Sequence, residues 1–370
     1  MGDEEAARNV TFVEIPALEG GYHAFYNPGG PGPEPFEGVR YTAPGPADLE
    51  PVINALDDPM RVDRNGPAGS AFVSVDQGDV LLAQNAAMFP EGIEWDAVNG
   101  QFLVGSITFG TIFSVQDNGV TRPFIESDNL TSSIGIHIDT ATNRLLVAVG
   151  NIQANMNEEL PGIAQLGIYD MATGEELHFV DLGSLYADGR HFANDVTVDA
   201  EGNAYVTDTL SPVIYKVDID GNAEVFLEAP DLAGFNGIDY HPNGYLLVAM
   251  NDEDALYKVP LEDPASFSMV ELSEPLAIDG MVVNEDLQVV AVRQLPPISR
   301  ADSVVLVVSE DDWATATVVA TAPALTRSFP TTITLRDGEP YVVHANFLAL
   351  RSGDIPHAFE ILRTSFTEVE

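Results

Sequence analysis

The sequence predicts an all-β protein, a six-bladed β-propeller with an N-terminal extension. A hairpin pattern recurs six times, and successive copies begin 42 to 60 residues apart. This spacing brackets the roughly 40 to 50 residues of a four-stranded propeller blade. No stretch shows sustained helical periodicity. With 370 residues and a hydrophobic fraction of 45%, the chain can bury a large core, and the repeat indicates that the core belongs to a single domain.

Each copy of the pattern is a short alternating strand, a turn and a second strand rich in β-forming residues. Two of the intervals are long because of the segments Asn151 to Gln165 and Arg293 to Ala301, which we expect to be loops. A hairpin unit cannot bury its faces alone, so the copies must stack around an axis. The six first strands are Glu91–Trp95, Ile134–Ile138, Asn194–Val198, Asn236–Tyr240, Asp279–Val283 and Thr331–Leu335.

The beginning of the chain does not carry the repeat. Residues 1–69 are rich in proline and glycine and are expected to be an extension, with the propeller formed by residues 70–370. The segment Ser70 to Ala83 is strand-like again. We expect it to add strands to the blade that begins at Thr331, which would close the ring and remove a free sheet edge; a hairpin elsewhere in the fold is the alternative.

The chain is strongly acidic, with 15 basic and 58 acidic residues and a net charge of −43. Such a surface repels nucleic acid and anionic membranes, so neither is expected as a partner. The charge is typical of solubility at high salt, as in a halophilic protein, and attraction of cations is the alternative. The absence of cysteine excludes disulfides and cysteine zinc sites.

No apolar run approaches the roughly 20 residues of a membrane span, and the acidic start Met1–Glu5 does not resemble a signal peptide. We therefore expect a soluble protein without a membrane span. It would be secreted or periplasmic, or lie in the cytoplasm of a salt-adapted organism. The sequence does not predict the oligomeric state.

The first position of the pattern is the strongest candidate for a functional site. Inner strands of all blades line one axis, so residues at one repeat position form a ring. Four of the six carry oxygen groups suited to Ca²⁺, Mg²⁺, Mn²⁺ or another divalent cation, which predicts an axial metal site. Ordinary turn chemistry is the alternative for any one of them. The six residues are Glu91, Ile134, Asn194, Asn236, Asp279 and Thr331.

Four motifs resemble those of the senescence marker protein (regucalcin)/gluconolactonase family, over roughly residues 85 to 345. They are Pro90–Trp95, Ala193–Val196, Phe235–Ile238 and Ile278–Met281. The resemblance implies a six-bladed propeller with a divalent metal, usually calcium, on its axis, and in many members a lactonase activity. It also implies four metal ligands, namely Glu91, Asn194, Asn236 and Asp279.

The resemblance places Asp279 at the metal as general base or as nucleophile. Its charge beside a cation should keep its pKa low, which suits a ligand better than a free base. His344, after the second strand of the last blade, is a second catalytic candidate that would orient substrate or shuttle a proton.

Four further residues are candidates for substrate binding: Ile134, His137, Phe192 and Thr331. Phe192 stands where sugar-lactone members carry arginine, and Ile134 is apolar, so a substrate less polar than a gluconate-like polyol is expected. Thr331 would bond metal-bound water. His137 lies three positions beyond Ile134, and strand alternation does not decide whether its side chain faces the central channel. Packing or a structural histidine is the alternative for each.

The expected function is a calcium-dependent hydrolase of a small-molecule lactone or related ester, in which the cation polarises the carbonyl. The first alternative is a phosphotriesterase or arylesterase, because diisopropyl fluorophosphatase and the paraoxonases are similar propellers with comparable ligands. The second is a propeller that binds a partner and carries only a structural metal.

Overall fold

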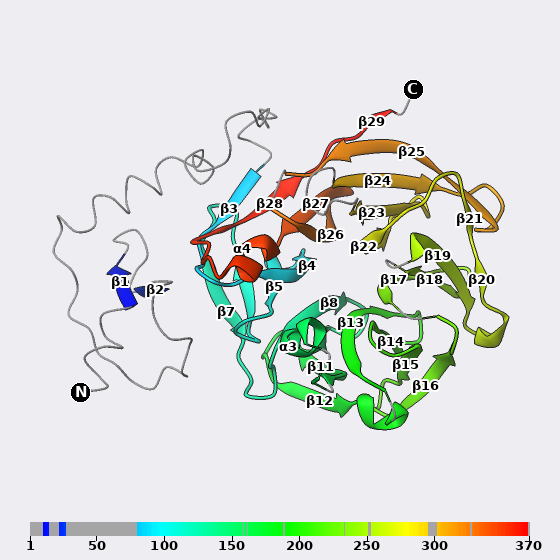
Figure 1. Ribbon diagram of the computed structural model, residues 1–370, viewed down its shortest axis with the longest axis horizontal. Helices are drawn as coiled ribbons and strands as arrows, with labels where there is room; N and C mark the ends of the chain where they lie inside the picture. Colours follow the sequence, from blue (N-terminus) through cyan, green and yellow to red (C-terminus); the bar gives the residue numbers. More distant parts are fainter. Residues whose placement is uncertain are drawn as a thin grey trace.

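The computed structural model describes residues 10–14, 22–26 and 80–368, except 158, 161, 188, 233, 251, 252, 295–301, 326 and 327. Six sheets surround one axis (Figure 1), which confirms the six-bladed propeller. Strands β1 (Val10–Glu14) and β2 (Tyr22–Tyr26) pair as an antiparallel hairpin. The rest of the predicted extension, and its boundary with the propeller, lie outside the described residues, so the domain division stays a prediction.

Each blade is built on four strands joined antiparallel. The first three blades are formed by β4 (Pro90–Asp96), β5 (Gln101–Ser106), β6 (Ile112–Val115) and β7 (Thr121–Ile125); by β8 (Ser133–Asp139), β9 (Arg144–Val149), β11 (Gln165–Asp170) and β12 (Glu176–Asp181); and by β13 (His191–Val198), β14 (Ala204–Asp208), β15 (Val213–Val217) and β16 (Ala223–Glu228).

The other three blades follow the same order from the axis outward. They are formed by β17 (Phe235–His241), β18 (Tyr245–Met250), β19 (Ala255–Pro260) and β20 (Ser268–Met269); by β22 (Ile278–Val283), β23 (Val289–Arg293), β24 (Ser303–Val308) and β25 (Thr315–Pro323); and by β26 (Pro330–Arg336), β27 (Glu339–His344), β28 (Phe359–Arg363) and β3 (Val80–Ala83). The short strands β21 (Glu271–Leu272) and β29 (Thr367–Glu368) both pair with β25.

The two ends of the propeller sequence share one blade. Strand β3 precedes the first blade in the chain but pairs antiparallel with β28, with Ala83 opposite Phe359. This confirms that the segment ending at Ala83 closes the ring with the blade begun at Thr331; residues 70–79 lie outside the described part. The pairing joins the two ends of the propeller sequence in one blade and so holds the ring closed.

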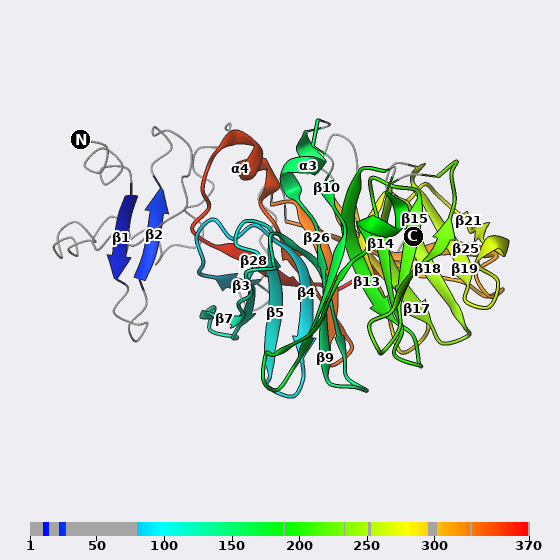
Figure 2. The same cartoon turned by 90° about the horizontal axis from the view of Figure 1, so that it is seen from below.

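The segment 151–165 was predicted to be a loop, and that is wrong in part. It contains helix α3 (Ile152–Met156) and strand β10 (Gly162–Ile163). The helix forms because the Asn151 side chain caps it, accepting from the Gln153 amide. A second helix, α4 (Phe347–Ser352), follows the second strand of the last blade. Both helices lie at the same end of the propeller (Figure 2). Among the described residues, the other helical turns are η3 (Gly183–Tyr186) and η5 (Pro264–Ser266).

The hydrophobic core lies between the blades rather than at one centre. Six clusters of buried apolar side chains each join two neighbouring blades. Between the last and first blades, for example, Val343 and Ile361 pack with Phe102 and Val104. This is the expected arrangement for a repeat whose sheets bury both faces against their neighbours.

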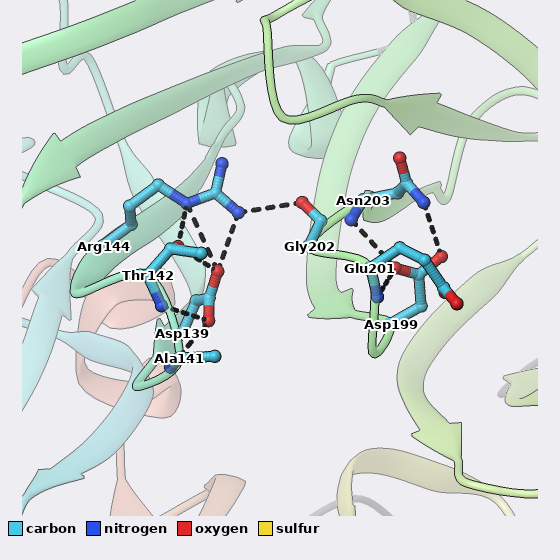
Figure 3. Close-up of polar contacts among 8 residues, drawn as sticks. All are labelled: Asp139, Ala141, Thr142, Arg144, Asp199, Glu201, Gly202 and Asn203. Atoms are coloured by element: carbon cyan, nitrogen blue, oxygen red, sulfur yellow. Dashed lines mark hydrogen bonds and ion pairs between the residues drawn. The ribbon is translucent and has the colours of Figure 1, made fainter.

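Aspartate side chains shape the turns that connect the first two strands. Asp199 accepts from the amides of Glu201 and Asn203, as the turn 199–203 predicts. Asp139 accepts in the same way from Ala141 and Thr142. Figure 3 shows these two turns side by side.

One arginine connects these two turns. Arg144 Nη2 donates to Asp139 Oδ2 at 2.7 Å in its own blade and to the carbonyl oxygen of Gly202 in the next blade at 2.8 Å (Figure 3). Its Nε also donates to Thr142 Oγ1 at 2.6 Å. Arg144 therefore ties the second and third blades together at their hairpin ends.

Candidate metal centre

Every inner strand carries a β-bulge at the same place. In each blade the first two residues of the repeated pattern fall inside the bulge and lack ladder partners on the second strand, which re-aims their side chains. The register shifts lie between Pro90 and Ile93, Ser133 and Ile136, Ala193 and Val196, Phe235 and Ile238, Ile278 and Met281, and Pro330 and Ile333.

The bulged segments touch one another around the axis. A Cβ atom on Gly92 would lie 2.4 Å from the carbonyl oxygen of Ile134, and one on Gly237 would lie 2.3 Å from that of Asp279. Only glycine fits such a close approach of backbone to backbone. At the closure of the ring, Thr331 Oγ1 donates to the carbonyl oxygen of Glu91 at 2.8 Å. The six first positions therefore form one ring.

Two buried carboxylates of this ring influence each other electrostatically. Glu91 is 7% exposed and Asp279 8%. Burial, followed by the charges of Asp279 and Asp195, raises the pKa of Glu91 well above its ordinary value. Burial also raises the pKa of Asp279 to about 7, although a hydrogen bond from Asn236 lowers it. Glu91 Oε2 is buried and has no hydrogen-bond partner among the described residues.

The amide residues of the ring are held by polar neighbours. Asn194 Nδ2 donates to Thr209 Oγ1 at 2.8 Å, so its oxygen Oδ1 is the atom that remains for a cation. Gln294 Nε2 donates to Asp279 Oδ2 at 2.5 Å and to the carbonyl oxygen of Pro330 at 3.1 Å. These contacts fix the orientation of one predicted amide ligand and one predicted carboxylate ligand.

Sequence reasoning missed Gln294 and Thr209. Both are the first residue after the second strand of a blade, and each lies 15 residues beyond the ring residue that it contacts. The equal spacing in two blades was a signal that could have identified them. Gln294 was instead grouped with the loop beginning at Arg293, most of which lies outside the described residues.

In five of the six blades the fourth position of the pattern carries a polar side chain, and these side chains form a second ring. His137 Nδ1 lies 3.2 Å from Glu94 Oε1 of the preceding blade. Thr334 Oγ1 lies 3.2 Å from Glu94 Oε2, and Thr197 Oγ1 donates to Asp239 Oδ1 at 2.8 Å. The bulge adds one residue between the first and fourth positions, so both can face the axis despite a spacing of three. His137 therefore lies next to acidic groups in this second ring, and its role in substrate binding stays a prediction.

The charge of His137 should make stability depend on pH. Burial lowers the pKa of His137, but the hydrogen bond and charge of Glu94, with the charges of Asp239 and Asp195, raise it to about 9. A raised pKa stabilises the fold below the unfolded value of 6.5, and this contribution disappears as pH rises through about 9. We therefore expect His137→Gln to lower the melting temperature at pH 6 and to match the wild type above pH 9.5.

The measurement is the melting temperature of both proteins from pH 6 to 10. His178→Gln, on the outermost strand of the same blade, is the control for replacing a histidine away from the axis. A difference between wild type and His137→Gln that stays constant across this range would contradict the assignment.

The structure also places the remaining catalytic and substrate-binding candidates, which are His344, Thr331, Ile134 and Phe192. His344 is fully buried opposite Pro330 in the sheet, its Nε2 accepts from the Leu325 amide at 3.3 Å, and burial lowers its pKa to about 4. A neutral ring of this kind also suits a structural histidine, so its catalytic role stays a prediction.

Thr331 joins two blades through its hydroxyl, as described above. Ile134 and Phe192 are buried in one apolar cluster.

The residues present fit a hard dication. Two carboxylates and two amide oxygens are the donors that calcium prefers, and the unpaired Glu91 Oε2 is a buried acceptor that needs a positive partner. No group of three or more His, Asp or Glu side chains has metal-binding geometry in the part of the chain that the structure describes. A site here would therefore depend on Asn194 and Asn236 as well as on the carboxylates.

Fold and ring together define the class: the chain is a six-bladed β-propeller with polar residues converging on its axis. It is similar to the major allergen Mala s 1 of Malassezia sympodialis, with 16% identity and a TM-score of 0.65 over 78% of this chain and 96% of that chain. It is also similar to a gluconolactonase from Xanthomonas campestris, with 14% identity and a TM-score of 0.53 over 77% and 89%.

A streptogramin B lyase matches at 12% identity and a TM-score of 0.52, over 78% of this chain and 98% of that chain. No protein-family model matches the chain, and no curated protein matches its sequence. The chain is thus distantly similar in structure to gluconolactonase-like propellers, lyases and an allergen. At these identities the likeness establishes the fold alone.

No helix among the described residues is long and apolar enough to cross a membrane.

Proposed function

We propose that the protein is a calcium-dependent hydrolase of a lactone or a related ester, with its catalytic centre at the axial ring. The observation that carries the proposal is the buried carboxylate pair of Glu91 and Asp279, one oxygen of which has no hydrogen-bond partner among the described residues. Two like charges buried together are unfavourable unless a cation compensates them or one group takes up a proton. The pair is therefore better suited to holding an ion than to holding the fold together.

Glu91, Asn194, Asn236 and Asp279 would hold the ion. The two carboxylates balance the charge of a dication, and the two amides add neutral oxygen donors. A bound dication would polarise the carbonyl of an ester or lactone and lower the pKa of a water molecule. Mg²⁺, Mn²⁺ or another divalent cation would suit the same donors, so calcium has to be compared with them.

The side chains around the ring would have different roles in proton transfer and in positioning the ligands. Asp279 would accept the proton of the attacking water, and Gln294 positions it by donating to Oδ2. Thr209 orients the amide of Asn194. His344, at the end of β27 in the last blade, is the second candidate for proton transfer.

The test is hydrolysis of a panel of lactones, aryl esters and phosphotriesters by the full chain, after chelation and after reloading with calcium, magnesium or manganese. We expect activity toward lactones or carboxylic esters that disappears on chelation and returns with calcium. Preferential turnover of phosphotriesters would assign the phosphotriesterase alternative. If no substrate is hydrolysed but chelation lowers the melting temperature, the metal is structural and the hydrolase proposal fails.

A further inference from the structure

A seventh apolar cluster differs in place from the six that join the blades. Its buried members are Phe89, Ile107, Ile134 and Phe192, which we call the apolar collar. Phe89 and Phe192 immediately precede the bulged segments of blades one and three, and Ile134 is itself a ring residue. The collar therefore lies at the axis, at the end of the propeller where the inner strands begin.

The collar borders two of the predicted ligands. Phe89 lies two residues before Glu91, Phe192 lies two residues before Asn194, and Ile134 occupies the ring position between those two ligands. On the other side of the ring, Gln294 makes its polar contact with Asp279. The ring thus has an apolar flank toward blade two and a polar flank toward blade five.

The local backbone is adapted to the collar. A Cβ atom on Gly150 would lie 3.0 Å from Phe192 Cε2, so the absence of a side chain at Gly150 makes room for the aromatic ring of Phe192. Phe89 has a φ of 45°, and Phe329, whose aromatic ring lies 5.1 Å from that of Phe347 in α4, has a φ of 56°. Non-glycine residues in this left-handed region cost about 1–2 kcal/mol each. Such strain persists only where surrounding contacts determine the conformation.

The collar is covered rather than open. Its four side chains are 1–4% exposed, and the cover is formed by Ile152 of α3 and by Phe347, Ala349 and Leu350 of α4. Figure 2 shows both helices at this end of the propeller. Helix α4 has six residues and lies between two left-handed residues, Asn346 with φ 56° and Gly353 with φ 77°. The helix therefore begins and ends at a residue in the left-handed conformation.

We propose that the apolar collar binds the alkyl or aryl substituent of the substrate, with α4 as its cover, so that the preferred substrates are apolar lactones and esters rather than polyol lactones. The inference rests on the proposed function, because it assumes that the substrate carbonyl lies at the ring. Burial of each methylene against the collar should strengthen binding about fourfold, from roughly 0.8 kcal/mol per CH₂.

The test uses γ-lactams with linear side chains of increasing length, which keep the carbonyl but resist hydrolysis. Their binding to the calcium-loaded full chain is measured by calorimetry. We expect Kd to fall about fourfold per methylene. Ile134→Thr should flatten this dependence, whereas Val282→Thr, the same kind of change outside the collar, should not. Gly150→Ala, which pushes on the Phe192 ring, should shorten the longest chain that still gains affinity.

The outcomes separate this inference from the proposed function. A flat length dependence in the wild type, or no lactam binding at all, overturns the inference even if lactones are hydrolysed. A length dependence that survives chelation and is lost in Ile134→Thr supports the collar even if no hydrolysis is found. An equal effect of Val282→Thr would show that the change in binding is unspecific and would also overturn it.

Discussion

Asp279→Asn is expected to abolish calcium-dependent hydrolysis and the stabilisation that calcium gives the wild type. Asparagine has nearly the same shape and can still accept from Gln294, but it removes one of the two negative charges in the ring. Loss of a charged ligand that also serves as base should lower kcat/KM on the order of 10³-fold.

Without calcium, Asp279→Asn should not reduce the stability of the protein. Removing the charge of Asp279 relieves its repulsion with Glu91, so metal-free Asp279→Asn should melt no lower than metal-free wild type. Calcium at 100 times its Kd should stabilise the wild type by about 2.7 kcal/mol, or about 5 °C, and should leave the variant unchanged. Thermal melts with and without calcium, beside the hydrolysis assay, measure both effects.

Asp239→Asn is the matched control, since Asp239 is a carboxylate of the second ring that accepts from Thr197 and from the amides of Tyr240 and Val283. It should keep the response to calcium. A full calcium response in Asp279→Asn would exclude Asp279 as a ligand.

Arg144→Met should destabilise the fold by about 3 kcal/mol, because breaking a buried ion pair leaves an uncompensated charge. Arg144 and Asp139 are each 5% exposed at the side chain. The variant also loses the bond to Gly202, which links two blades. Thr142 continues to donate to Asp139, which keeps the loss at the lower end of the expected range. Denaturant unfolding of both proteins at pH 7 measures the difference.

This loss should depend on pH in a defined direction. Burial raises the pKa of Asp139, but the hydrogen bonds from Thr142 and Arg144 outweigh it and lower the pKa below 3.8. The stabilisation is therefore present above pH 4 and is lost as pH falls through the lowered folded value. Arg363→Met, in an exposed pair with Glu339 at 3.2 Å, should change stability by less than about 1 kcal/mol. An equal loss in both variants would contradict the role of Arg144 as a link between blades.

The repeat made the fold predictable. Six alternating strands at a blade-like spacing determined the inner strands, and the strand before Ala83 determined how the ring closes. Residue types at the first position of the repeat also indicated the axial ring, because equivalent positions in a closed array of blades must meet at the axis.

The sequence did not predict two local features: the helix in segment 151–165 and the direction in which the His137 side chain points. The segment 151–165 contains too few residues in regular structure for a periodic signal, and its helix forms through the Asn151 cap. Strand alternation could not predict whether the His137 side chain faces the axis. The bulge between Ser133 and Ile136 adds one residue to the strand and so shifts the alternation of its side chains.

The sequence by itself determined the six-fold array and the identity of the residues on its axis, because both follow from a period along the chain. Only the tertiary structure decided which groups hold those residues. Gln294 meets Pro330 and Arg144 meets Gly202 through packing of neighbouring blades. The apolar collar likewise combines side chains from three blades and two helices. Such contacts join residues of different blades, so they arise only when the blades are in place.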